Sequence, residues 1–458
     1  MKTGVIKINE AFHSGYRIDP SLHLSDGAKV RSELAHLPYA LTTVSGCSSS
    51  IFLGNIFSRC FVEKPEYGVT YLAASDTVLS NIETGRYLSK KQAAKLDYLM
   101  LDKDWILVTC SGTLGNVTYT NKTFCNKIAT HDLIRIIPDD HKYKKGCLYA
   151  FLSGKYGYFQ ITQSQFGGVV KHINDKQAGA ILVPVFPDDI QQKVDELIQE
   201  SARLKEEATN SLNEAKSLIV DFCEIPFVKK EGLDAEIVSS SNIHNSLNVR
   251  FDAPVFMNDG VCWARQIKRE TVLLGDCQIK TWYPGMFKRA YVENGYPYIK
   301  GSELFLANPF SRCEMLSRTK TPKLEQLWLK EGQLLISCAG ACGLVKLITK
   351  EYEEKQAIGS PDIIRLTSED PLFTKEYLFV YLQIPAIYEY MQSLKYGSVI
   401  ERFDISNIET IPIVKPTEML SRKVTEIIHH YADYTYRAFK AEEMAISMVE
   451  KEIEKWNN

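Results

Sequence analysis

Residues 105–115 read Trp-Ile-Leu-Val-Thr-Cys-Ser-Gly-Thr-Leu-Gly, and residues 333–343 read Gln-Leu-Leu-Ile-Ser-Cys-Ala-Gly-Ala-Cys-Gly. Each stretch begins with an apolar run typical of a buried strand and ends in two glycines typical of a tight turn. The glycines coincide when the two stretches are aligned at an offset of about 230 residues. A repeat of this period indicates that the chain contains the same structural unit twice.

Further matches follow in the same order at nearly the same offset. They pair residues 16–20 with 249–253, 131–135 with 361–365, 165–170 with 395–400, and 183–187 with 411–416. Collinear matches of this kind fix the architecture more firmly than local propensity does. We therefore predict an α+β fold with two pseudo-repeated globular domains, at residues 1–187 and 223–416.

A long helical pattern follows each copy directly after a proline, which is a common residue at a helix entry. These patterns span residues 188–222 and 417–458. Apolar residues recur at alternating steps of three and four, as in a coiled-coil seam. The seam residues are Ile190, Val194, Leu197 and Leu204 in the first helix and Leu420, Val424, Ile427 and Tyr431 in the second.

An amphipathic helix usually covers the core of its own domain, and that alternative applies to either helix taken alone. Two matched copies favour a different arrangement. We expect the helices to pack against each other as an antiparallel coiled coil. At about 1.5 Å per residue each would be roughly 45–57 Å long, which suits a spacer between two domains.

The composition is that of an ordinary globular protein, with 24% charged and 45% hydrophobic residues. The N-terminus lacks the apolar core of a signal peptide, and no apolar run reaches the roughly 18 residues needed to span a membrane. We expect a cytoplasmic protein with no membrane partner. Eleven scattered cysteines suit buried thiols in a reducing compartment better than a disulfide framework.

The formal net charge of −2 excludes a global basic field, but charge segregates along the chain. Between Lys268 and Lys323, ten Lys or Arg residues face five acidic ones. Between Asp188 and Val220, eight acidic residues face four basic ones. This pattern is compatible with a basic surface beside an acidic helix, although charge runs are most often solvated faces.

The residues that could form a catalytic or cofactor-binding motif do not have the spacing or sequence that such a motif requires. The glycine pairs lead into second strand-like runs at residues 116–119 and 344–347, whereas a dinucleotide site needs a helix there. Cys313, Cys338 and Cys342 lack the spacing of a zinc knuckle. The tetrapeptide expected of an amino-methyltransferase is missing. A nuclease-like set at Asp188 and Glu214–Lys216 would lie about 39 Å apart on one helix. We therefore predict no catalytic residue and no bound metal.

The run from Gly397 to Ile413, a looser copy from Gly167 to Val185, and the opening Arg250–Ala253 are similar to parts of the specificity (S) subunits of type I restriction-modification enzymes. The resemblance extends over nearly the whole chain, and the motifs that carry it are short and hydrophobic. The chain departs from the pattern in carrying Pro20 where the second copy has Ala253, and the two long helices differ in sequence.

This resemblance implies a non-catalytic subunit that gives partner enzymes their DNA sequence specificity. Each domain would read one half of a bipartite site in double-stranded DNA. The helices would set the gap between the half-sites and dock two modification (methyltransferase) subunits, through which restriction subunits could join. The resemblance also implies that this chain binds no cofactor, and that S-adenosylmethionine, ATP and Mg²⁺ belong to the partner subunits.

Phosphate contacts in such domains come from Lys and Arg, and base edges are read by polar side chains on projecting loops. Each residue below lies in a polar or glycine-marked segment, where the alternative is an ordinary solvated charge. The candidates are Lys90, Lys91, Lys171 and His172 in the first domain and Lys280, Lys288, Arg289, Lys300, Lys395 and Arg402 in the second.

Two other functions stay open at this point. The chain could be a stand-alone DNA-modifying or DNA-cleaving enzyme whose catalytic motif is not recognisable. It could also be a two-headed adaptor that binds proteins rather than DNA. Methyltransfer by the purified chain would favour the first, and failure to bind any duplex would favour the second.

Overall fold

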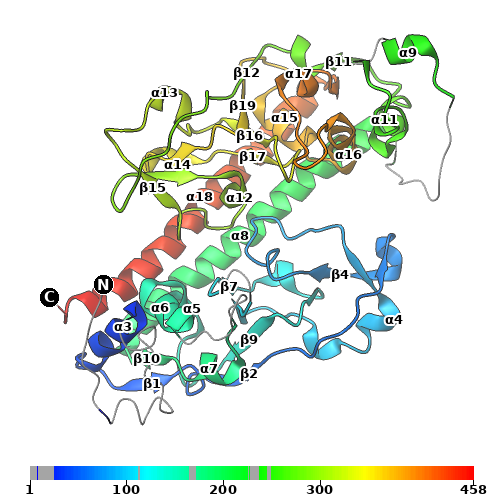
Figure 1. The fold of residues 1–458 in the computed structure, drawn as a ribbon. Helices are drawn as coiled ribbons and strands as arrows, with labels where there is room; N and C mark the ends of the chain where they lie inside the picture. The colour runs from blue at the N-terminus through cyan, green and yellow to red at the C-terminus, as the bar shows by residue number, and fades with distance from the viewer. Residues whose placement is uncertain are drawn as a thin grey trace. The chain divides into compact units, whose positions relative to one another are not determined.

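The computed structural model describes residue 8 and residues 25–111, 114–163, 172–224, 226, 237–244 and 249–457. The chain divides into two compact units, and Figure 1 labels many of their elements. Unit 1 comprises Met1–Glu206 and Arg437–Asn458, and unit 2 comprises Glu207–Tyr436. Each unit is therefore one repeat together with segments of both long helices.

Unit 1 is built from short strands and helices that precede a long helix. Its strands are β1 (Leu41–Thr43), β2 (Ser48–Phe52), β3 (Phe61–Val62), β4 (Gly68–Leu72), β5 (Tyr87–Ser89), β6 (Ile106–Thr109), β7 (Val117–Tyr119), β8 (Ile128–Ala129), β9 (Leu133–Pro138) and β10 (Leu182–Pro184). Its helices are α3 (Asp26–Ala35), α4 (Lys90–Ala93), α5 (Lys145–Ser153), α6 (Lys155–Gln163), α7 (Asp175–Gly179) and the first part of α8 (Asp188–Cys223).

Unit 2 repeats this order. Its strands are β11 (Thr271–Leu273), β12 (Ile279–Trp282), β13 (Tyr291–Val292), β14 (Tyr296–Ile299), β15 (Glu314–Leu316), β16 (Leu334–Ser337), β17 (Val345–Leu347), β18 (Ile358–Gly359), β19 (Ile363–Ser368) and β20 (Pro412–Val414). Its helices are α9 (Ser240–His244), α10 (Pro254–Met257), α11 (Asp259–Ala264), α12 (Gly301–Leu304), α13 (Leu324–Leu327), α14 (Lys350–Glu354), α15 (Lys375–Tyr381), α16 (Pro385–Leu394), α17 (Ile405–Ile408) and the first part of α18 (Glu418–Glu454).

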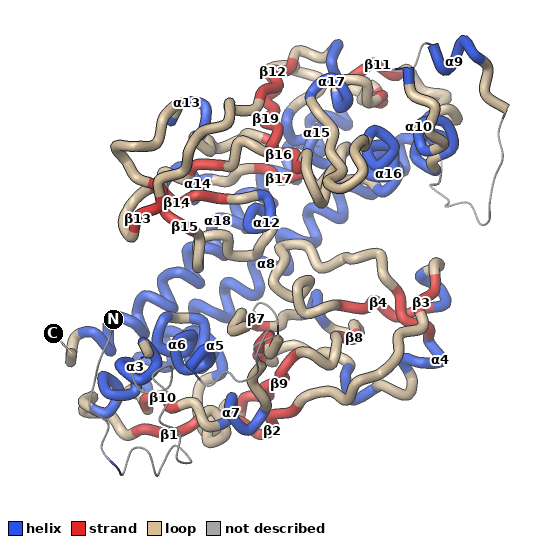
Figure 2. The backbone as a smooth tube through the Cα atoms, in the orientation of Figure 1, coloured by secondary structure: helices blue, strands red, loops and turns tan. Residues whose placement is uncertain are grey.

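The sheets of the two units have the same topology. Unit 1 holds sheets of order β2-β9-β6-β7, β3-β5-β4-β8 and β1-β10, and unit 2 holds β12-β19-β16-β17, β13-β15-β14-β18 and β11-β20. We call β3-β5-β4-β8 and β13-β15-β14-β18 the small sheets, and β2-β9-β6-β7 and β12-β19-β16-β17 the large sheets. The only parallel pair among the strands of each unit lies within its small sheet, between β4 and β8 in unit 1 and between β14 and β18 in unit 2. The predicted duplication is confirmed. Figure 2 shows how short the strands are relative to the loops that connect them.

The two stretches that carry the repeat form equivalent hairpins. All four residues of β6 are buried, as are all four of β16, because each strand is covered on both faces. Gly115 and Gly343 have φ angles of 84° and 89°, which residues with a side chain rarely adopt. They turn β6 into β7 and β16 into β17, so the predicted strand-turn-strand arrangement is what the structure contains.

A close helix crossing also recurs in both units. Gly27 in the first turn of α3 lies against α6, and a Cβ atom there would stand 2.5 Å from the Phe159 carbonyl oxygen. Gly260 in α11 lies against α16, and a Cβ atom there would stand 2.1 Å from the Tyr390 amide nitrogen. An asparagine or serine caps each helix, since the side chains of Ser25 and Asn258 accept from backbone amides.

The helices α8 and α18 pair in an antiparallel sense within each unit. In unit 1, Val194 and Ile198 of α8 share a core with Ala445 and Val449 of α18. The Ser201 hydroxyl donates to the Ala438 carbonyl oxygen at 2.8 Å. In this way the N-terminal half of α8 meets the C-terminal half of α18.

Unit 2 contains the complementary halves. Its core includes Ala208, Leu212, Ala215 and Ile219 of α8, together with four apolar residues of α18, namely Leu420, Val424, Ile428 and Tyr431. The same core holds the apolar residues of α15, together with Leu334 and Ile336 of β16 and Ile364 and Leu366 of β19. Each helix therefore contributes to the hydrophobic core of both units.

The residues of the predicted seam lie on this packed face, with small differences in depth. Val194, Leu204, Leu420, Val424 and Tyr431 are buried. The remaining three pack only partly against the core, namely Ile190, Leu197 and Ile427. Their neighbours Ile198 and Ile428 lie deeper, and the packed face of α8 also holds the buried polar residues Gln191, Asp195 and Ser201.

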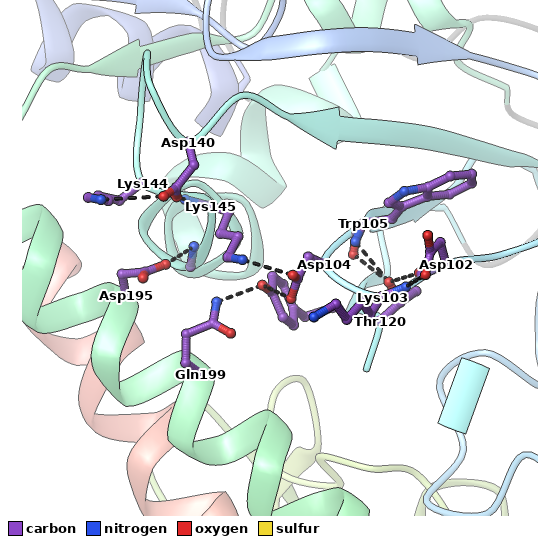
Figure 3. A network of polar contacts seen from close by, with 12 residues as sticks. Asp102, Lys103, Asp104, Trp105, Thr120, Asp140, Lys144, Lys145, Asp195 and Gln199 are labelled. Carbon is purple, nitrogen blue, oxygen red and sulfur yellow. Dashed lines mark hydrogen bonds and ion pairs between the residues drawn. The ribbon is translucent and has the colours of Figure 1, made fainter. Parts of the chain in front are cut away.

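A polar network ties the sheet domain of unit 1 to α8 (Figure 3). Lys145 in the first turn of α5 forms an ion pair of 2.8 Å with Asp104, and the Tyr119 hydroxyl donates to the same carboxylate. Gln199 of α8 donates to the Tyr119 oxygen at 2.7 Å. Asp195 of α8 accepts from the Gly146 amide at 2.6 Å, so the N-terminus of α5 is held against the long helix.

We predict that Gly27→Ala and Gly260→Ala each destabilise the protein by about 2 kcal/mol or more, because the added methyl group collides with backbone atoms of the crossing helix. The measurement is the denaturation midpoint of the full chain. Gly301→Ala is the matched control, since a Cβ atom at Gly301 meets nothing within 4 Å. Equal midpoints for all three variants would show that the crossing is looser than described.

Candidate functional site

In each unit a buried arginine joins the large sheet to the small sheet. Arg135 of β9 is fully buried and donates to the carbonyl oxygens of Ala129 and Thr130, at the end of β8. Arg365 of β19 donates to the carbonyl oxygens of Gly359 and Ser360, at the end of β18. Burial lowers the pKa of each arginine to about 10. These cations are structural and are unavailable to a ligand.

A second arginine lies at the surface beside each of these junctions. The Nε atom of Arg59 donates to the Tyr71 hydroxyl of β4 at 2.6 Å, and its guanidinium lies over the tyrosine ring. The Nε atom of Arg289 donates to the Tyr298 hydroxyl of β14 at 2.8 Å and stacks in the same way. The two arginines occupy equivalent places in the two units.

Sequence reasoning selected Arg289 but missed Arg59. The signal was present, because residues 56–62 read Ile-Phe-Ser-Arg-Cys-Phe-Val and residues 286–292 read Met-Phe-Lys-Arg-Ala-Tyr-Val. Phenylalanine, arginine and valine coincide at the repeat offset. We call these two segments the Phe-x-Arg segments.

The Phe-x-Arg segments expose apolar side chains next to the arginine. Ile56 and Met286, at equivalent positions, are 85% and 67% exposed. Phe61 and Tyr291 are also exposed, and each lies on the first strand of its small sheet. Each unit therefore presents one arginine among exposed apolar side chains, a combination suited to binding rather than to bond-making.

In unit 2 a hairpin over residues 396–402 lies against the β16–β17 turn. Tyr396 and Arg402 pair across the hairpin, and the Gly340 amide donates to the Glu401 carbonyl oxygen at 3.1 Å. Val399 and Ile400 at its tip are 93% and 66% exposed. The hairpin thus extends the β16–β17 turn outward.

The predicted cations of unit 2 fall into two groups. Three are engaged by carboxylates: Arg289 with Asp362 at 3.8 Å, Lys395 with Glu401, and Lys300 with Glu303 and Glu314. The bond to Glu314 is the main cause of a raised pKa at Lys300. The described residues provide no ion-pair partner for the other three, which are exposed, namely Lys280, Lys288 and Arg402. Lys280 lies over the Trp282 ring.

In unit 1 the structure places two predicted lysines beside the Phe-x-Arg segment. Lys90 and Lys91 are exposed in the first turn of α4. Gln92 of the same helix accepts from the Cys60 amide at 2.7 Å and donates to the Ser58 carbonyl oxygen, which clamps α4 to the segment. His172 is half-buried and bridges Ser111, and Lys171 lies outside the described residues.

The cysteines next to the glycine turns are core thiols. Cys110 and Cys338 are buried, and burial raises the pKa of each to about 11. A thiol with so high a pKa is almost fully protonated at neutral pH and is a poor nucleophile. The Cys338 thiol donates to the Asp362 carbonyl oxygen at 3.2 Å.

Within the ranges that the structure describes, no group of three or more His, Cys, Asp or Glu residues could hold a metal ion. No helix in these ranges is long and apolar enough to cross a membrane.

Comparison with known proteins gives a family match that follows the duplication. The model of the "Type I restriction modification DNA specificity domain" matches residues 54–214 and again residues 280–434. The two matches together span more than half of the chain, and both Phe-x-Arg segments lie within them. A search of curated proteins finds no match.

Solved structures with a similar arrangement include two S subunits. One is the S subunit of a type I restriction-modification system from M. genitalium, 13% identical, with a TM-score of 0.36 over 92% of this chain and 96% of that chain. The other is the HsdS subunit from Thermoanaerobacter tengcongensis, 13% identical, with a TM-score of 0.28 over 91% of this chain and 97% of that chain.

We predict that iodoacetamide at pH 8 alkylates exposed Cys60 first in the native chain and leaves Cys110 and Cys338 unmodified. At a pKa of about 11 the thiolate fraction of these buried residues is still only about 1% at pH 9, so raising the pH adds little labelling. Peptide mass mapping reads out the sites. Denatured protein, in which all cysteines react, is the control, and rapid native labelling of Cys338 would contradict the described burial.

Proposed function

Because the chain belongs to the family of type I restriction-modification DNA specificity domains, we propose that it serves as the specificity subunit of such a complex, with each unit reading one half of a bipartite DNA site. The observation that carries this proposal is the duplication. Two units of identical sheet topology each match the specificity-domain model, and each presents the same arginine-bearing surface segment. Two readers on one chain suit a target made of two separated half-sites.

We assign the chemistry of the complex to other subunits. The described surface carries cations and aromatic side chains, which serve recognition of nucleic acid. In the proposed complex two modification subunits dock on the helices and transfer methyl groups from S-adenosylmethionine. Restriction subunits that use ATP and Mg²⁺ join through them. The present chain then contributes sequence recognition alone.

Within this proposal α8 and α18 set the gap between the half-sites. Each helix contributes to the cores of both units, so its length is coupled to both readers. The face that packs is apolar, with polar interruptions such as Ser201, which bonds across to Ala438. A seam with such interruptions fixes the register of the two helices.

We predict that replacing residues 1–187 with the first domain of another family member changes one half-site and leaves the other intact. The donor should keep the residue equivalent to Tyr149, whose hydroxyl donates to Glu442 of α18, so that the unit 1 core still closes. Long-read methylation mapping of a host carrying the complex reads out both half-sites. Exchange of residues 223–416 is the reciprocal control, and a change in both half-sites from one exchange would refute the two-reader arrangement.

We further predict that inserting one heptad into each helix, after Glu206 and after Tyr436, widens the gap by about three base pairs. Seven residues lengthen a helix by roughly 10.5 Å, and ten base pairs span roughly 34 Å. Paired insertions preserve the seam, whereas a heptad in α8 alone shifts it and should abolish methylation. An unchanged gap in the methylation map would refute the spacer role.

The same experiments separate this function from its alternatives. Methyltransfer by the purified chain alone would establish an enzyme. Failure of the assembled complex to bind any duplex, with the chain folded, would establish a protein adaptor.

A further inference from the structure

The two Phe-x-Arg segments are alike in structure although the units around them differ in sequence. In each unit the arginine Nε donates to the hydroxyl of a tyrosine on the strand that pairs in parallel at the sheet junction. Both tyrosines, Tyr71 and Tyr298, are buried. A buried phenol that accepts from Nε holds the guanidinium plane at a fixed angle to the sheet.

The outer edge of each guanidinium keeps a donor available. Arg59 uses Nη2 on the Thr130 hydroxyl at 3.3 Å, and Arg289 directs Nη2 to Asp362 at 3.8 Å. No described residue accepts a hydrogen bond from Nη1 of either arginine. Asp362 is 42% exposed, so its long ion pair is weak and can be exchanged for a stronger anion.

The surroundings of both arginines suit a polyanion. Lys90 and Lys91 lie on the helix that clamps the first Phe-x-Arg segment, and Lys288 lies within the second. All three are exposed. Oriented arginines flanked by lysines are typical of surfaces that contact phosphates.

An element that is the same in both readers cannot carry the information by which they differ. Two half-sites share the sugar-phosphate backbone, whereas their base sequences are read by parts of the units that differ. Resting on the function proposed above, we propose that Arg59 and Arg289 each bind a backbone phosphate at the equivalent place in their own half-site, and that Tyr71 and Tyr298 are the positioning residues that aim them.

The test uses the full chain assembled with its modification subunits and a duplex carrying the mapped site. Binding is measured by fluorescence anisotropy between 50 and 200 mM salt, on that duplex and on duplexes mismatched in one half-site. We expect Arg59→Ala and Arg289→Ala each to reduce the slope of log affinity against log salt by about 0.9, the value for one lost phosphate contact. Each should weaken binding by the same factor on matched and mismatched duplexes.

Variants that conserve the charge distinguish the effect of guanidinium orientation from the effect of the charge itself. Arg59→Lys and Arg289→Lys should retain the salt slope. Tyr71→Phe and Tyr298→Phe should retain it too, while lowering affinity several-fold because the guanidinium is no longer oriented. The tyrosine variants carry the test if an alanine variant fails to fold, which its thermal midpoint reveals, because wild-type affinity in both tyrosine variants would overturn the inference. Lys29→Ala on α3, with a side chain 76% exposed and a net charge change like that of the arginine variants, is the matched control and should leave the slope unchanged.

The outcomes distinguish this inference from the proposed function. If the wild-type complex prefers no duplex, the proposed function fails. If it binds its site specifically but the alanine variants keep the wild-type affinity and slope, only the phosphate contact is refuted. If a variant changes the preferred bases of one half-site, the substituted arginine contacts bases rather than phosphate. If Lys29→Ala changes the salt slope by the same amount, the effect of the arginine variants is due to net charge alone. Either result also overturns the inference.

Discussion

The hydrophobic core of each unit is completed by a helix segment from the other half of the chain, and the rest of the structure depends on that exchange. Ala445 and Val449, near the end of the chain, pack beside Val194 in unit 1, and Leu212 of the first helix packs beside Val424 in unit 2. Removing such contacts would open a core, at a cost of about 2–5 kcal/mol for each large apolar side chain lost. The polar network through Asp195 and Gln199 then orients the sheet domain on its helix.

Some features of this scaffold are present in both units and others differ between them, and the difference suggests their roles. The sheet order, the buried Arg135 and Arg365, the glycine turns and the Phe-x-Arg segments recur in both units. Some of the charged residues around them differ. Position 58 is serine in the first unit where position 288 is lysine in the second, and Asp104, which pairs with Lys145, stands where the second unit has Gly332. Two domains that read different half-sites require a shared fold with different surface residues.

The duplication, the strand-turn-strand elements and the two long helices follow from the sequence, because a repeat and a heptad pattern are long signals. The small sheets do not, since β3 and β8 have two residues each and show no periodicity. Arg135 and Arg365 could not be placed either, because an arginine is exposed by default and only the carbonyl oxygens of a second sheet make its burial tolerable. The heptad pattern places Ile427 on the seam, whereas its neighbour Ile428 is the residue that is fully buried in the core. The binding role of individual lysines stays a prediction, since exposure alone does not separate a ligand contact from a solvated charge.

The shared helices also impose an order on the making of the protein. Unit 1 includes Arg437–Asn458, which leave the ribosome after all of unit 2. At synthesis rates of about 5–20 residues per second, more than 200 residues must be added after the first repeat before its core can close. During that interval the face formed by Val194 and Ile198 lacks its α18 partners, and such exposed apolar surface is prone to aggregation. A chain truncated within α18 would leave the N-terminal unit incomplete, although every residue of its own repeat is present.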